Sequence, residues 1–210
     1  MKIDIYPLGL IQTNCYVLSN ENGDALIIDP GDEGARLRKE IDKKRLKPVA
    51  ILLTHAHFDH IGAVDYIRDH YSIPVYMHKE EADWLSNPNL NGSGKYADLP
   101  NVSNRAADHF IEEGTVSIGP FTFDVKHTPG HSPGSLSFVF DNDRLAIVGD
   151  TLFKESIGRT DLIGGDTQTL LNSIHSKLLS LDDDYAIYPG HGPFTFIEDE
   201  KDHNPFLNGF

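Results

Sequence analysis

Three histidines and one aspartate fall within six consecutive positions, as His55, His57, Asp59 and His60. Imidazole nitrogens and carboxylate oxygens are the ligands that zinc, iron and manganese take from proteins. In an extended segment, the i, i+2 spacing turns His55 and His57 to the same side, while Asp59 and His60 face a neighbouring point. The pattern therefore predicts a metal site. The alternative is a polar loop that happens to be rich in histidine.

Four apolar, strand-like runs each end in a candidate ligand. The runs 49–54, 121–125, 145–149 and 185–190 lead to His55, His131, Asp150 and His191. Glycine or proline adjoins the ligand in the last three, which gives a sharp turn at the strand end. Ligands on loops at one edge of a packed sheet converge on one site. Five histidines and two aspartates are more ligands than one tetrahedral metal ion can bind, and this number suits two ions.

The remaining histidines and the only cysteine carry no such pattern. His127 is interpreted as a residue that supports the turn before His131 or holds a ligand in place. Cys15 has no histidine or lysine beside it, so we expect a buried structural thiol rather than a nucleophile. Surface or core positions are expected for His70, His78, His109, His175 and His203.

The elements that must position these residues alternate between strands and helices. Helices are predicted over 32–46 with Asp32 as the cap, with Leu37 and Ile41 on the inner face, over 62–71, from about 79, and over 167–181. The segment 87–108 is interpreted as a long loop of the kind that forms a lid or a binding loop. A hairpin turn is predicted at 20–23. Strands are predicted at 2–6, 14–19, 25–29, 49–54, 74–78, 116–118, 121–127, 135–140, 145–148 and 185–188.

Composition narrows the class of protein. The 210 residues carry 18 basic and 32 acidic side chains, a formal net charge of -14 that disfavours binding to nucleic acid. The longest aliphatic run, 49–53, is far too short to cross a bilayer, and no secretory signal is visible at the N-terminus. One cysteine suits a reducing compartment. We therefore expect one α/β domain over residues 1–210, located in the cytoplasm and bound neither to membrane nor to nucleic acid.

The motifs together resemble those of the metallo-β-lactamase superfamily, and within it the glyoxalase II-like (hydroxyacylglutathione hydrolase-like) hydrolases. The phrases that carry the resemblance lie at 54–60, 127–135, 149–153, 157–161, 189–193 and 204–207. The resemblance implies a four-layer αβ/βα sandwich, in which mixed sheets pack face to face beneath outer helices. Two-domain glyoxalase II adds a C-terminal helical domain that holds glutathione. Only 19 residues follow His191, so that domain is expected to be absent.

The resemblance also implies the ligand sets. His55, His57 and His131 would hold one divalent metal ion. Asp59, His60 and His191 would hold a second, and Asp150 would bridge the two. Zinc is favoured, with iron and manganese as alternatives. Arg159 aligns with a glutathione-binding lysine of the larger enzymes and would pair with a substrate carboxylate, with a structural salt bridge as the alternative.

These sets predict a hydrolytic mechanism. Two divalent ions and the carboxylates of Asp59 and Asp150 leave a net charge of about +2, which lowers the pKa of a bridging water from about 15.7 toward 7. The resulting hydroxide would attack the carbonyl of an S-lactoyl or other 2-hydroxyacyl thioester of a small thiol. Asp59 would orient that hydroxide or accept its proton. No amino-acid nucleophile is required.

Three alternatives stay open. A persulfide dioxygenase of this superfamily uses a single iron and has no need of Asp59, His60 and His191. A β-lactamase usually carries cysteine or serine where this chain has Asp150. A non-catalytic metal-binding module would be free to lose ligands, whereas all seven are present. The acyl group, the carrier thiol and the oligomeric state are not indicated by the sequence.

Overall fold

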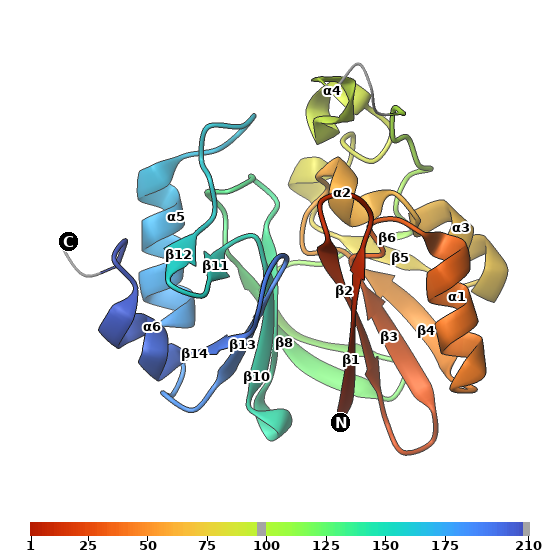
Figure 1. Ribbon diagram of the computed structural model, residues 1–210, viewed down its shortest axis with the longest axis horizontal. Helices are drawn as coiled ribbons and strands as arrows, with labels where there is room; N and C mark the ends of the chain where they lie inside the picture. Colours follow the sequence, from red (N-terminus) through yellow and green to blue (C-terminus); the bar gives the residue numbers. More distant parts are fainter. Residues whose placement is uncertain (96–99, 208–210) are drawn as a thin grey trace. The chain divides into compact units, whose positions relative to one another are not determined.

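The structure is a computed structural model that describes residues 1–95 and 100–207. The chain forms two compact units, the first of Met1–Ile111 with Ile118–Pro120 and the second of Glu112–Ser117 with Phe121–Phe210. Each unit has a six-stranded sheet accompanied by helices, as Figure 1 shows. The expected α/β class is thereby confirmed. A single domain over residues 1–210 stays a prediction.

The sheet of the first unit runs in chain order from β1 to β6. The pairs β1–β2 and β2–β3 are antiparallel, and the pairs from β3 to β6 are parallel. The predicted turn between β2 and β3 is present, because the Gly23 amide donates to the Asn20 carbonyl at 3.1 Å. The strands are β1 (Lys2–Leu8), β2 (Thr13–Ser19), β3 (Asp24–Ile28), β4 (Lys47–Leu52), β5 (Val75–Met77) and β6 (His109–Phe110).

Helices lie outside this sheet. In Figure 1, α1 and α3 lie side by side, and the Tyr71 hydroxyl at the end of α3 donates to Asp42 Oδ1 of α1 at 2.8 Å. α1 buries Leu37 and Ile41, as its periodicity predicts. The helical segments are α1 (Gly34–Lys43), α2 (Phe58–Ile61), α3 (Val64–Tyr71), the 3-10 turn η1 (Lys79–Glu81), α4 (Pro88–Asn91) and the 3-10 turn η2 (Ser93–Lys95).

Two helix predictions in this unit were wrong. Asp32 does not cap α1, because Glu33 takes the cap position with a left-handed φ of 48° and Asp32 accepts a hydrogen bond from the Glu33 amide instead. The helix expected from residue 79 stops after one 3-10 turn. Asn87 then accepts the Asn89 amide and Pro88 opens the separate helix α4, so the chain cannot continue one long helix through this point.

Two further boundaries differ from the expectation. The helix predicted over 62–71 begins at Val64 and is preceded by the short helix α2. The segment 87–108 is not a featureless loop, because α4 and η2 lie within it. Residues 96–99 of that segment lie outside the described residues.

The second unit has the sheet order β14-β13-β10-β9-β8-β7, in which β10 and β13 are parallel and β8–β9, β9–β10 and β13–β14 are antiparallel. A two-stranded ribbon, β11–β12, follows β10. Buried Leu170, Leu171 and Ile174 join the apolar core of this unit. Its strands are β7 (Gly114–Ile118), β8 (Phe121–His127), β9 (Leu136–Phe140), β10 (Leu145–Gly149), β11 (Leu152–Phe153), β12 (Ser156–Ile157), β13 (Ala186–Pro189) and β14 (Thr195–Phe196).

The helices of this unit are α5 (Thr167–Ser173), continued by the π-helical turn η4 (Ile174–Leu178), and α6 (Ile197–His203), with a 3-10 turn η3 (Asp141–Asp143) between strands. The helix predicted over 167–181 thus ends earlier and changes its hydrogen-bond pattern. The expectation lacked β11, β12, β14 and α6 in this unit, as it lacked β6 in the first. None of the helices in the described part of the chain combines the length and apolar character needed to cross a membrane.

Candidate metal centre

The loop that follows β4 brings four predicted ligands together in the first unit. The imidazole rings of His55 and His57 lie 4.7 Å apart between centroids, and those of His55 and His60 lie 4.1 Å apart. His60 Nε2 lies 3.5 Å from Oδ2 of Asp59, whose side chain is 15% exposed. All three histidines are buried. The side chains of the histidine-rich motif thus face one point rather than solvent.

Close backbone contacts fix the position of this loop. A Cβ added at Gly31 would lie 1.8 Å from the Asp59 carbonyl oxygen, so only glycine fits there. The Thr13 hydroxyl at the start of β2 donates to Asp59 Oδ2 at 2.8 Å. Asp59 is therefore held in place by Thr13 at the start of β2 and by the close approach of Gly31, which follows β3.

Asp29, directly after β3, holds the histidine-rich segment in place through hydrogen bonds. Its buried carboxylate accepts the Thr54 amide at 2.8 Å, the Thr54 hydroxyl at 2.6 Å and His60 Nδ1 at 2.9 Å. The Thr54 hydroxyl gives its one proton to Asp29, so toward His55 Nδ1, at 3.1 Å, it is an acceptor. Both imidazoles then carry a proton on Nδ1 and present the Nε2 lone pair. This arrangement is typical of histidines that bind metal ions.

The second unit contributes the other three predicted ligands. Asp150 Oδ2 lies 3.6 Å from His131 Nε2 and 3.5 Å from His191 Nε2. The Arg159 backbone carbonyl accepts a hydrogen bond from His131 Nδ1–H at 2.8 Å, which again leaves Nε2 as the nitrogen that could bind a metal ion. Gly149, at the end of β10, has a left-handed φ of 52°, and this turn of the backbone sets the direction of the Asp150 side chain. One carboxylate oxygen thus stands between two imidazole nitrogens.

The spacing of the donor atoms fits a bound metal ion. Ligands at bond lengths of about 2.0–2.2 Å around a tetrahedral ion are separated by about 3.4 Å. The contacts of 3.5 Å and 3.6 Å among His60, Asp59, His131, Asp150 and His191 are close to that value. They are longer than ordinary hydrogen bonds between nitrogen and oxygen. The donor set of imidazoles and carboxylates is also the one that zinc and iron accept.

Three residues that support the ligands did not stand out in the sequence. Asp29 carries the same signal as the ligands, a carboxylate at the end of an apolar strand, and could have been found by it. Glu81 and Trp84 carry no such signal, because the charged stretch around 79–81 looks like an exposed helix. Fully buried Glu81 accepts the Ala56 amide at 2.6 Å, and the Trp84 ring packs 5.6 Å from that of His57.

The structure also shows the contacts of three other residues singled out in the sequence, namely Cys15, His127 and Arg159. Cys15 is fully buried, and burial together with the nearby charge of Asp29 raises the pKa of its thiol well above the usual value. A neutral buried thiol is not a nucleophile, which agrees with the structural interpretation. His127 Nε2 contacts the Pro133 carbonyl at 2.8 Å and so spans the turn that carries His131. The Arg159 guanidinium is exposed and makes a two-pronged contact with Asp161 at 2.7 and 2.8 Å.

Removing the support behind the histidines is expected to weaken metal binding. In the Asp29→Asn variant, we expect metal affinity to fall by 10- to 100-fold, on the order found when hydrogen-bond partners of metal-binding histidines are lost. Competition with a chromophoric chelator measures the change. Asp124→Asn is the control, since Asp124 bonds the Thr115 hydroxyl on an exposed surface. Equal affinities for both variants would contradict the role of Asp29.

Comparison with known proteins places these features in context. The family model described as "Metallo-beta-lactamase superfamily" matches residues 8–191. "Probable metallo-hydrolase YqgX" of Bacillus subtilis is 51% identical, with 100% of this chain and 99% of the relative covered. "Hydroxyacylglutathione hydrolase GloC" of Haemophilus influenzae is 39% identical, with 99% of each covered.

Two solved structures are also similar. BLEG-1, described as a B3 metallo-beta-lactamase, has a TM-score of 0.97 at 52% identity and covers 99% of this chain and 100% of its own. TTHA1623, solved in a di-iron-bound form, has a TM-score of 0.86 at 38% identity, with 97% of this chain and 100% of its own covered.

Proposed function

The chain belongs to the metallo-beta-lactamase superfamily, and from this premise we propose that it is a binuclear metal-dependent hydrolase of S-lactoyl or other 2-hydroxyacyl thioesters of a small thiol. The observation that carries the two-metal proposal is the place of Asp150 Oδ2 between His131 Nε2 and His191 Nε2. A carboxylate oxygen shared by two imidazoles suits a ligand that two ions have in common. The thioester substrate is supported by similarity to GloC over the whole chain.

The ligand assignment follows the family pattern. We assign His55, His57 and His131 to one ion and Asp59, His60 and His191 to the other, with Asp150 common to both. Zinc is the proposed metal because the ligands are nitrogen and oxygen atoms suited to it. Iron is the main alternative, supported by the di-iron form of TTHA1623. Metal analysis of the purified protein decides between them.

When bound, such ions lower the pKa of a coordinated water and so supply hydroxide at neutral pH. The residues of the chain then orient the reaction. Asp59 keeps one carboxylate oxygen on the Thr13 hydroxyl at 2.8 Å, which fixes the carboxylate for orienting the attacking water or accepting its proton. Thr54 and Asp29 hold His55 and His60 in one tautomer, so the ligand nitrogens need not reorganise during turnover.

The test is to assay S-lactoyl thioesters of several small thiols and to measure metal content on the same sample. We expect close to two metal ions per chain and hydrolysis that a chelator abolishes and added metal restores. Full metal content with no hydrolysis of any thioester would overturn the proposal. The proposed partner is a small molecule alone, and the single cysteine supports a proposed location in the cytoplasm.

A second candidate is β-lactam hydrolysis, which the similarity to BLEG-1 favours. Asp150 argues against it as the main activity, because β-lactamases usually carry cysteine or serine at that position. Nitrocefin hydrolysis on the same sample tests it. We expect kcat/KM for nitrocefin to be lower than for the best thioester. The opposite order would make β-lactam hydrolysis the better proposal.

Arg159 is the proposed contact for a carboxylate on the carrier thiol. Its exposed pair with Asp161 is worth about 1 kcal/mol or less, so the guanidinium can change partner at low cost. In Arg159→Ala, we expect KM for S-lactoylglutathione to rise about tenfold with kcat and metal content unchanged. Arg144→Ala is the matched control, since Arg144 pairs with Asp182 and Asp184 on the surface. An unchanged KM would return Arg159 to a structural salt bridge.

A further inference from the structure

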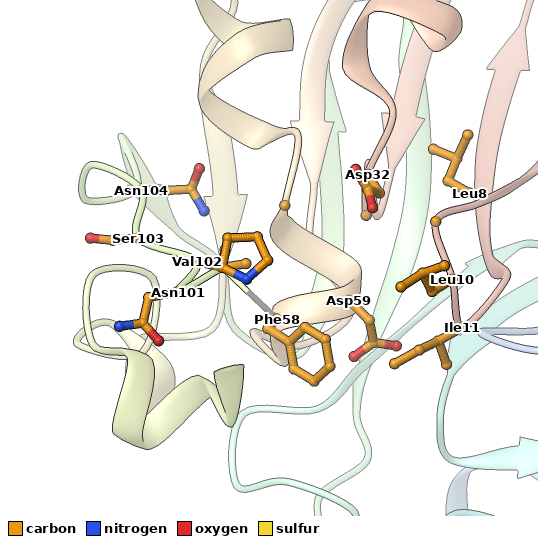
Figure 2. A pocket seen from close by; sticks show the side chains of 14 residues that line it. Leu8, Leu10, Ile11, Asp32, Phe58, Asp59, Asn101, Val102, Ser103 and Asn104 are labelled. Carbon is orange, nitrogen blue, oxygen red and sulfur yellow. The ribbon is translucent and has the colours of Figure 1, made fainter. Parts of the chain in front are cut away.

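The first unit contains a pocket of about 300 Å³, and Asp59 is the one residue of its lining that the ligand assignment uses. The turn between β1 and β2, the start of α2 and the segment 100–104 line it (Figure 2). Asp59, a proposed metal ligand, belongs to this lining. The pocket therefore adjoins the ligand set of the first unit, and it has the volume of a small-molecule site.

The rim of this pocket is unusually apolar for a surface. Leu10 is 85% exposed and Ile11 is 48% exposed, although both are large hydrophobic side chains. Figure 2 shows both side chains beside Asp59, with Phe58 nearby. Covering exposed apolar side chains with an apolar group is favourable in proportion to the apolar area removed from water. An alkyl or other uncharged group in the pocket would therefore be stabilised by this rim.

Charge restricts the ligand further. Among the lining residues that the structure describes, the only ionisable side chains are those of Asp32 and Asp59, and none is lysine, arginine or histidine. Because Asp59 is a proposed metal ligand, Asp32 is the one charged side chain of this lining outside the proposed ligand set. A carboxylate held beside Asp32 would meet a like charge, and it would find no lysine, arginine or histidine in the lining to pair with. Asn101 and Ser103 supply neutral polar groups to the lining. The pocket thus suits an uncharged group with or without a hydroxyl.

We propose that this pocket receives the acyl group of the thioester and selects uncharged acyl groups over those that end in a carboxylate. The proposal rests on the proposed thioesterase function, in which Arg159 of the second unit takes a carboxylate of the carrier thiol. The acyl side of the scissile bond is then the side without a required charge. Asp59 connects the pocket to the site of water attack on the acyl carbonyl.

The experiment compares hexanoyl and adipoyl thioesters of N-acetylcysteamine, which have the same chain length and the same thiol. With the metal-loaded full chain, we expect kcat/KM for the hexanoyl thioester to be at least about tenfold higher, mainly through KM. In Leu10→Lys, a cation at the rim should reduce that ratio at least about fivefold. Ile5→Lys on β1 is the control, because Ile5 is 41% exposed and lies outside the pocket, and its ratio should equal that of the unmodified protein.

Binding gives a readout that does not depend on turnover. Calorimetry with the corresponding S-hexyl and S-(5-carboxypentyl) thioethers, which cannot be hydrolysed, should show the same preference and the same response to Leu10→Lys. Hydrolysis of both thioesters at equal efficiency, unaffected by Leu10→Lys, would overturn the role of the pocket and leave the thioesterase proposal intact. Thioether selectivity without hydrolysis of any thioester would support the pocket and overturn the thioesterase proposal.

Discussion

The Asp150→Ala variant is expected to lose thioester hydrolysis by about 1000-fold or more, equivalent to about 4 kcal/mol of transition-state stabilisation, together with much of its bound metal. The physical reason is that one oxygen of Asp150 lies within 3.6 Å of His131 Nε2 and 3.5 Å of His191 Nε2. Its removal takes away a ligand proposed to be common to both ions. Two cations would then repel each other across a site with one negative charge fewer.

The measurements for Asp150→Ala are kcat/KM for an S-lactoyl thioester and metal content per chain. Circular dichroism checks that the variant is folded. Asp124→Ala is the control, because Asp124 is a half-buried carboxylate on β8 outside the proposed ligand set, and its loss should leave both quantities unchanged. Near-normal turnover with full metal content in Asp150→Ala would contradict the two-metal assignment.

The His191→Ala variant separates the hydrolase from a mono-iron dioxygenase. His191 belongs only to the proposed second ligand set, so its loss should lower metal content from close to two ions to about one and reduce kcat/KM by 100-fold or more, about 3 kcal/mol. A dioxygenase that binds one iron through His55, His57, His131 and Asp150 would keep most of its activity in this variant. Metal analysis, thioesterase assays and oxygen-electrode measurements on one sample provide the readouts.

The matched control for His191→Ala is His175→Ala, since His175 is exposed on η4 away from the predicted ligands in the chain. We expect His175→Ala to keep full metal content and activity. Oxygen uptake that depends on glutathione persulfide, with one iron per chain and no thioesterase activity, would overturn the hydrolase proposal in favour of the dioxygenase.

Much of the fold was predictable because its signals are local. Apolar runs such as 121–127 became strands at the predicted positions, since a strand buried in a sheet needs only a short stretch of suitable side chains. The elements that were absent from the expectation are of a different kind. β6, β11, β12 and β14 have two residues each, and α6 is rich in charged residues and buries only Ile197 and Glu200. Such segments take their structure from tertiary partners, which leave no periodic pattern.

The boundaries that differed have the same origin. The cap of α1 moved from Asp32 to Glu33, because the left-handed residue at the helix start is set by the path of the preceding loop. A cap motif in a sequence marks a residue that can accept a backbone amide. The direction in which the chain enters the helix decides which residue does so.

The sequence by itself determined which residues can bind metal. The ligand types and the strand-end turns before them are local properties, as the left-handed φ of Gly149 before Asp150 illustrates. Only the tertiary structure decided how those ligands are held. Asp29 meets His60 across 31 residues, Thr13 meets Asp59 across 46, and the Arg159 carbonyl meets His131 across 28. These contacts fix the tautomers and rotamers that suit the imidazoles to the proposed role of metal ligands, and no spacing in one sequence encodes pairs so far apart.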